Sequence, residues 1–139
     1  MIFLSPGADR PARNLNRQEL IDLVVNKYFS NVDGKNHQLV LDCFAEDAVL
    51  RVQSADVEHH GHEGIGRMFS DFMNTPTIHH GDFTHIVDVE AQTIASQFVA
   101  INTYDDGGRV EMRNCNFFDV ENGLFKRVTI YMTDENPLV

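Results

Sequence analysis

Histidines are the side chains in this sequence whose ordinary pKa best suits acid–base chemistry near neutral pH. There are seven of them, and imidazole accepts or donates a proton near neutral pH. His79 and His80 are neighbours in a segment of alternating residue types, so they must point to opposite faces of a strand. We therefore expect one of the two to face an interior, and a bulge at Gly81 and Asp82 would exchange them.

A zinc site is the other chemistry that clustered histidines can support. His59, His60 and His62 lie close together, and His79, His80 and His85 follow later in the chain. However, no helical pair of histidines has the i, i+4 spacing, and the first cluster falls in a predicted loop. Neither Cys43 nor Cys115 has a second thiol nearby. We predict no metal site and no cofactor.

Two asparagines stand on an otherwise apolar strand face. Alternation over residues 109–120 puts Asn114 and Asn116 on the same face as Met112 and Phe118. A buried amide without partners costs about 1–3 kcal/mol. Either these amides face a cavity that holds water or a polar ligand, or the strand is an edge and they are half exposed. Both alternatives remain open from the sequence.

Three amphipathic helices and a set of long strands must position these groups. Asn16 and Glu19 form a capping-box pattern at the start of the first helix, and Pro76 follows the third. Helical periodicity and strand alternation give the following order: helices beginning at residues 16 and 36, a short strand at 48–53, a loop at 54–62, a helix through 65–73, and strands at 77–89, 93–104, 109–120 and 124–133.

This order predicts an α+β fold with a single domain over residues 16–139. Three N-terminal helices pack on one face of a strongly curved, mostly antiparallel sheet and enclose a pocket between the two layers. Residues 1–15 contain Pro6, Gly7 and Pro11 without periodicity, so we predict an extended or disordered arm. A hollow of this kind favours binding or conversion of a small molecule.

Composition narrows the possible partners. The formal net charge of −10 disfavours both nucleic acid and an anionic membrane surface. No apolar run approaches the roughly 20 residues of a membrane span, and residues 1–4 are too short for a signal-peptide core. Two cysteines without framework spacing are typical of reduced thiols. We therefore predict a cytoplasmic protein.

The plan resembles the SnoaL-like family of the nuclear transport factor 2-like superfamily, whose relatives include ketosteroid isomerase and scytalone dehydratase. The resemblance covers residues 16 to about 135 and rests on these stretches: Tyr28-Phe29, Asp33-Gly34, Phe44-Ala45-Glu46-Asp47-Ala48, Gly64-Ile65 and residues 127–134. It implies a cone-shaped α+β barrel, a pocket between helices and sheet, and a homodimer formed through the outer sheet face.

The resemblance also implies roles for individual residues. Tyr28 matches a tyrosine that donates to an oxyanion, and Asn116 falls where a second donor is found. His79, with His80 as the alternative, resembles a catalytic histidine. The implied catalytic set is thus Tyr28, His79, His80 and Asn116. The implied pocket walls are Val52, Phe69, Met73, Phe98, Tyr104, Met112, Asn114, Phe118, Ile130 and Met132.

One departure from the family pattern leaves the function open. Val52 occupies the position of the isomerase's carboxylate base, and valine cannot accept a proton. One hypothesis is a cofactor-free isomerase, cyclase or dehydratase acting on a small apolar carbonyl or hydroxyl compound. The other is a non-catalytic ligand-binding or scaffold protein of the same fold, similar to the small subunit of ring-hydroxylating dioxygenases.

Overall fold

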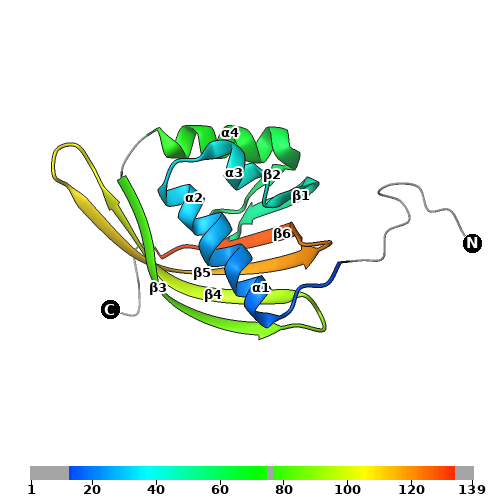
Figure 1. Cartoon of the computed structure of the whole chain (residues 1–139). Coiled ribbons are helices and arrows are strands. Elements are labelled where there is room, and N and C mark those ends of the chain that lie inside the picture. Colours follow the sequence, from blue (N-terminus) through cyan, green and yellow to red (C-terminus); the bar gives the residue numbers. More distant parts are fainter. Residues whose placement is uncertain (1–12, 75–76, 134–139) are drawn as a thin grey trace, which may run out of the picture.

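The computed structural model describes residues 13–74 and 77–133, in which helices cover the concave face of one curved sheet (Figure 1). Residues 1–12 of the predicted arm lie outside the described residues. The predicted α+β plan is confirmed, because three helices lie against a mostly antiparallel sheet.

The first helix is continuous from residue 17 to 33 but is not regular. It comprises α1 (Arg17–Asp22), the π-helical segment η1 (Leu23–Phe29) and α2 (Ser30–Asp33). The Asn16 side chain accepts from the Glu19 N–H at 2.8 Å, and the Glu19 carboxylate accepts from the Asn16 N–H at 3.0 Å. The predicted capping box is therefore present. In η1 the hydrogen bonds reach back five residues, as from the Ser30 N–H to the Val25 carbonyl.

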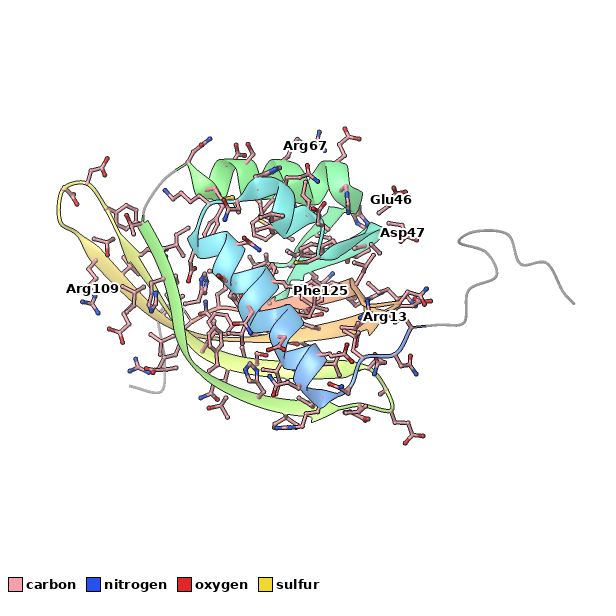
Figure 2. All side chains as sticks on the ribbon, in the orientation of Figure 1. Arg13, Glu46, Asp47, Arg67, Arg109 and Phe125 are labelled. Carbon is pink, nitrogen blue, oxygen red and sulfur yellow. The ribbon has the colours of Figure 1, made fainter. Side chains whose placement is uncertain are left out.

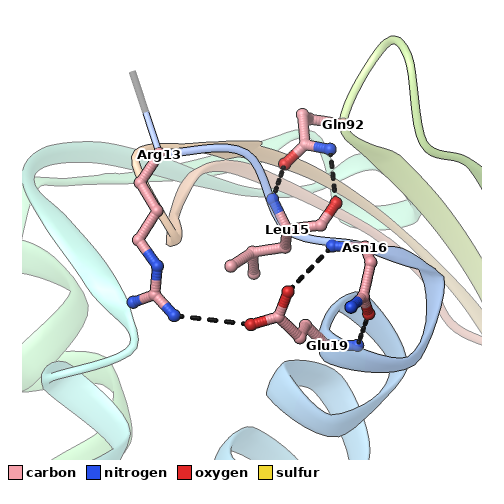
Figure 3. A network of polar contacts seen from close by, with 5 residues as sticks. All are labelled: Arg13, Leu15, Asn16, Glu19 and Gln92. Carbon is pink, nitrogen blue, oxygen red and sulfur yellow. Dashed lines mark hydrogen bonds and ion pairs between the residues drawn. The ribbon is translucent and has the colours of Figure 1, made fainter. Parts of the chain in front are cut away.

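A single glutamine fastens the chain before this helix to the end of the sheet (Figure 3). The Gln92 Oε1 accepts from the Leu15 N–H at 2.8 Å, and its Nε2 donates to the Leu15 carbonyl at 2.9 Å. Both side chains are buried, so these backbone groups are shielded from water. The clamp fixes where the helix starts and so contributes to where its far end lies.

The middle of the chain contains more regular structure than its sequence indicates. Helix α3 (His37–Leu41) leads into β1 (Phe44–Val52), which is followed by the short 3-10 turn η2 (Gln53–Ala55), β2 (Val57–His60) and α4 (Gly61–Met73). The prediction of a loop over 54–62 was wrong. Strand β2 is an edge strand paired with β1 alone, so its polar residues can stay exposed and the apolar alternation is missing.

Within the described residues, six strands form one sheet in the order β2-β1-β6-β5-β4-β3. The last four, confirming the predicted strands closely, are β3 (Thr77–Asp88), β4 (Thr93–Thr103), β5 (Arg109–Glu121) and β6 (Leu124–Tyr131). All neighbours are antiparallel except β1 and β6. The β4–β5 hairpin extends beyond the helical layer (Figure 1).

Aromatic side chains form the core between the two layers. Phe44, Phe118 and Phe125 are at most 1% exposed, and each ring lies within 6 Å of the Tyr28 ring. Figure 2 shows Phe125 pointing inward, whereas Arg67 on α4 points away from the body. This packed end of the cone leaves the opposite end less filled.

No helix in the described part of the chain is both long and apolar enough to cross a membrane.

Candidate active site

A cavity of about 160 Å³ lies between the first helix, α4 and the inner face of the sheet. Its walls are mostly aromatic and aliphatic, and the polar groups come from one tyrosine, one histidine and three asparagines. The residues that line it are Tyr28, Phe29, Val32, Val52, Met68, Phe69, Phe72, His80, Phe98, Ala100, Asn102, Met112, Asn114, Asn116, Ile130 and Met132.

Small residues on β4 help to create this space. Strand register aligns His80 of β3, Ala100 of β4 and Met112 of β5 across the inner face. Ala100 is the shortest of the three, and its methyl group lies at the cavity wall. Neighbouring strands are about 4.8 Å apart, so the side chains of His80 and Met112 stand on either side of Ala100. The space over the Ala100 methyl group therefore stays open.

His80 faces the cavity and is held there by Asp33 at the end of the first helix. The His80 Nδ1 lies 2.5 Å from Asp33 Oδ1, and the His80 backbone N–H donates to Asp33 Oδ2 at 2.8 Å. A carboxylate only accepts hydrogen bonds, so in the neutral form of the ring the proton lies on Nδ1 and the Nε2 lone pair is free. The His80 side chain is 9% exposed, and the Phe29 ring lies 4.6 Å away.

His79 points the other way. Its side chain is 72% exposed, and its Nδ1 is 4.0 Å from Asp33 Oδ2. The bulge lies after the pair, between Gly81 and Thr84, where Asp82 has a φ of 54°. It therefore leaves His80 on the inner face and also turns His85 inward. The leading candidate from the sequence is on the outer surface, and the alternative is at the cavity.

Tyr28 lies deep in the cavity wall and is 3% exposed. Burial, with a smaller contribution from the neighbouring Cys43 thiol, raises the pKa of the Tyr28 hydroxyl well above its ordinary value. The group therefore stays protonated at any physiological pH. It can donate a hydrogen bond to a substrate oxygen but cannot serve as a phenolate base.

The asparagines are buried, which settles the alternatives left by the sequence. Strand β5 lies inside the sheet between β4 and β6, so Asn114 and Asn116 are 6% and 2% exposed. Asn114 Oδ1 accepts from the Thr133 N–H at 3.1 Å. The Oδ1 atoms of Asn102 and Asn116 are buried without a hydrogen-bond partner in the described part of the chain. These two amide oxygens could therefore each accept a hydrogen bond from a ligand in the mostly apolar cavity.

The structure brings together most of the residues predicted for the site. Those that line the cavity are Tyr28, His80, Asn116, Val52, Phe69, Phe98, Met112, Asn114, Ile130 and Met132. Four others lie elsewhere. His79 is on the outer face, Tyr104 is 43% exposed at the β4–β5 turn, and Met73 and Phe118 are buried in the core outside the cavity lining.

Sequence reasoning missed Asp33, because the Asp-Gly pair at 33–34 indicates no more than the turn that ends the first helix. A signal was present. A carboxylate at a helix C-terminus faces the negative end of the helix dipole, so it needs a favourable partner elsewhere. Also missed were the wall residues Phe29, Val32, Met68, Phe72, Ala100 and Asn102. Ala100 and Asn102 share a face with Phe98, so alternation alone could have found them.

The histidines do not converge on a metal. Over residues 13–74 and 77–133, no three His, Cys, Asp or Glu side chains are grouped as metal ligands. His62 Nε2 instead contacts the Phe44 carbonyl at 2.8 Å, and His85 Nδ1 contacts the Ser96 hydroxyl at 2.8 Å.

Comparison with known proteins agrees with this architecture. A polyketide cyclase, provisionally so named, from Xanthomonas campestris pv. campestris has a TM-score of 0.75 at 21% identity, covering 84% of this chain and 92% of its own. A provisionally named isomerase from Bacillus subtilis has a TM-score of 0.75 at 14% identity, covering 89% and 91%. An LEH-like epoxide hydrolase from M. tuberculosis has a TM-score of 0.71 at 13% identity, covering 84% of each chain. At these identities the likeness shows the fold alone. No curated protein matches the sequence.

Fold and cavity together define an α+β protein with a small-molecule pocket between its helices and a curved sheet. The family described as the SnoaL-like domain matches residues 25–128, and the chain belongs to that family.

Proposed function

We propose that this protein is an enzyme that moves a proton on a small carbonyl or hydroxyl compound without a cofactor. The observation that carries the proposal is the His80–Asp33 pair at the wall of an apolar cavity. A histidine oriented by a carboxylate, with its second nitrogen free, is a common form of general base.

The residues around this pair suggest how the reaction would proceed. His80 Nε2 takes a proton from the carbon next to a substrate carbonyl, and Asp33 stabilises the imidazolium that forms. The electron pair of the broken C–H bond moves toward the carbonyl oxygen. The Tyr28 hydroxyl and the Asn116 amide can donate to that oxygen, where a dry site makes each hydrogen bond more effective. In a β,γ-unsaturated carbonyl compound the enolate extends over the double bond, and returning the proton from His80 Nε2 to the γ carbon then completes an isomerisation.

The names of the structural neighbours are compatible with proton-transfer chemistry, but they do not identify one reaction. Cyclisation and isomerisation of carbonyl compounds can both proceed through an enolate, whereas opening of an epoxide by hydrolysis needs an activated water. The His80–Asp33 pair could serve either purpose, since both need a base. We favour carbon acids because Tyr28 and Asn116 supply donors for a developing oxyanion in the same cavity.

A direct test is deuterium uptake by cyclohexanone in D₂O, followed by NMR. A positioned general base contributes roughly a hundredfold to ten-thousandfold in rate. His80→Gln should lower the enzyme-dependent rate at least a hundredfold. Asp33→Asn should lower it at least tenfold, because an amide can present its donor to Nδ1 and reverse the tautomer. His60→Gln, on the edge strand β2 with a 68% exposed side chain, is the control and should exchange at the wild-type rate.

A non-catalytic ligand-binding protein is the second candidate. It is favoured by Val52, which lines the cavity and supplies no carboxylate. If His80→Gln exchanges cyclohexanone as fast as the wild type, or if wild-type protein adds nothing to the buffer rate, the enzyme proposal fails and this second candidate takes its place.

A further inference from the structure

We infer that the cavity takes an uncharged compound of one ring that carries a hydroxyl group. The inference rests on the proposed function, since it names the substrate class of the same cavity. Three independent features support it, namely the volume, the charge and the unpartnered amide oxygens.

The volume limits the ligand to one ring. A cavity of about 150 Å³ in another protein binds benzene, so about 160 Å³ suits a six-membered ring with one or two small substituents. Two fused rings exceed this volume, so the second ring would have to extend out of the cavity or displace its walls. The rings of Phe29 and Phe98, whose centroids are 4.7 Å apart, pack against each other and resist such movement.

The charge around the cavity disfavours ionised ligands of either sign. None of the residues that line it is Lys or Arg, so a buried carboxylate or phosphate would find no permanent positive charge. The carboxylate of Asp33, which is bound to His80 at the cavity wall, repels anions. Both of its oxygens already accept hydrogen bonds from His80, so it offers little to a cation. A net charge of −10 further lowers the local concentration of anions.

The amide oxygens call for a hydrogen-bond donor on the ligand. Asn102 Oδ1 and Asn116 Oδ1 are buried acceptors without a partner among the described residues. An unpaired buried acceptor is costly, and a ligand hydroxyl would remove that cost by donating to it. Asn116 lies beside Ile130 and Ser96 in the strand register, deep on the inner face. A ring hydroxyl directed toward Asn116 would leave the rest of the ring against apolar walls.

Binding of matched single-ring probes tests this inference without relying on turnover. Benzyl alcohol, benzoate and benzylamine share the ring but differ in charge, and naphthalenemethanol adds a second ring. Affinities are measured by NMR titration of the protein. We expect benzyl alcohol to bind at least tenfold more tightly than the other three and to shift the side-chain amide signals of Asn102 and Asn116.

A variant of the amide tests the hydroxyl requirement. Asn116→Leu has nearly the same size and should weaken benzyl alcohol about threefold to tenfold, the effect of one lost hydrogen bond. Asn26→Leu, on the exposed face of the first helix, is the matched control and should bind as the wild type does. Unchanged affinity in Asn116→Leu would overturn the hydroxyl assignment.

The other outcomes are also decisive. Benzoate, benzylamine or naphthalenemethanol binding as tightly as benzyl alcohol would overturn the inference, and so would no binding of any probe. These binding results test the ligand class only and do not test the proposed enzyme activity. If benzyl alcohol binds but cyclohexanone does not exchange, the enzyme proposal is refuted and the inferred ligand class is still supported.

Discussion

Replacing Ala100 by a larger residue should fill the cavity, which should raise the stability of the protein and abolish its ligand binding. Ala100 is 2% exposed and contributes a methyl group to the cavity wall between His80 and Met112. Replacing it by leucine puts three more carbons into space that protein atoms do not occupy. Most substitutions of this kind strain a packed core, but here the added atoms enter a cavity of about 160 Å³.

The expected gain follows from the buried carbons. Three carbons at about 0.8 kcal/mol each contribute about 2.4 kcal/mol. Fixing the leucine rotamer costs about 0.5–1 kcal/mol, so the free energy of unfolding should rise by about 1.5 kcal/mol. For a chain of 139 residues this corresponds to a Tm increase of roughly 6 °C. Ligand binding and proton exchange should be lost, since the new side chain occupies the substrate's place.

Thermal unfolding by circular dichroism and NMR titration with benzyl alcohol measure the two effects. Ala95→Leu is the control, because Ala95 is on the same strand with its side chain on the opposite face. That variant should bind benzyl alcohol as the wild type does. A Tm for Ala100→Leu that falls by several degrees would show that the cavity cannot accommodate the leucine side chain. Undiminished binding would show that the ligand sits elsewhere, and either result would refute the reasoning.

Three further predictions concern stability and assembly. Gln92→Ala should lower the free energy of unfolding by about 2–4 kcal/mol, measured by urea denaturation, because it leaves the buried N–H and carbonyl of Leu15 unpaired; a loss below 0.5 kcal/mol would contradict the clamp. Burial, and then the nearby Arg17, lowers the pKa of His85. The unfolded chain thus binds a proton at higher pH than the fold does, and stability should fall as pH drops below about 6.5. The fall in Tm between pH 7 and pH 5 should be smaller in His85→Gln, and an equal fall would contradict it. We also propose a homodimer through the outer sheet face, where Phe117 and Tyr131 are each 44% exposed with ring centroids 5.9 Å apart. Phe117→Glu should convert a dimer to a monomer in analytical ultracentrifugation, and a monomeric wild type would rule the dimer out.

Strand alternation is the most reliable guide in this sequence. It predicts that Met112, Asn114 and Asn116 share one face, and all three line the cavity. Period-two alternation works here because β5 has neighbours on both sides and one face toward the core, so a register error would bury charged side chains. It fails at β2, where a short edge strand has no face that must be apolar.

The pairing of Asp33 with His80 could not be predicted in the same way. The two residues are 47 positions apart, and their contact depends on how the first helix crosses the sheet. That crossing is fixed by the Gln92 clamp at one end of the helix and by packing along its length. Residue types could suggest that a histidine would face inward, but they could not say which carboxylate would meet it.

Two local irregularities bring the site together, and both depart from the regular periods on which sequence reasoning relies. In the π-helical segment η1 the consecutive residues Tyr28 and Phe29 both face inward, each 3% exposed. Tyr28 then reaches the cavity wall, while Phe29 covers the ring of His80. The bulge in β3 follows directly after His80, so the strand bends just beyond the residue that meets Asp33. Irregular segments at a binding site are often functional. Here they lie on the strand that supplies the proposed base, His80, and on the helix that supplies Tyr28, the proposed donor to the substrate oxygen.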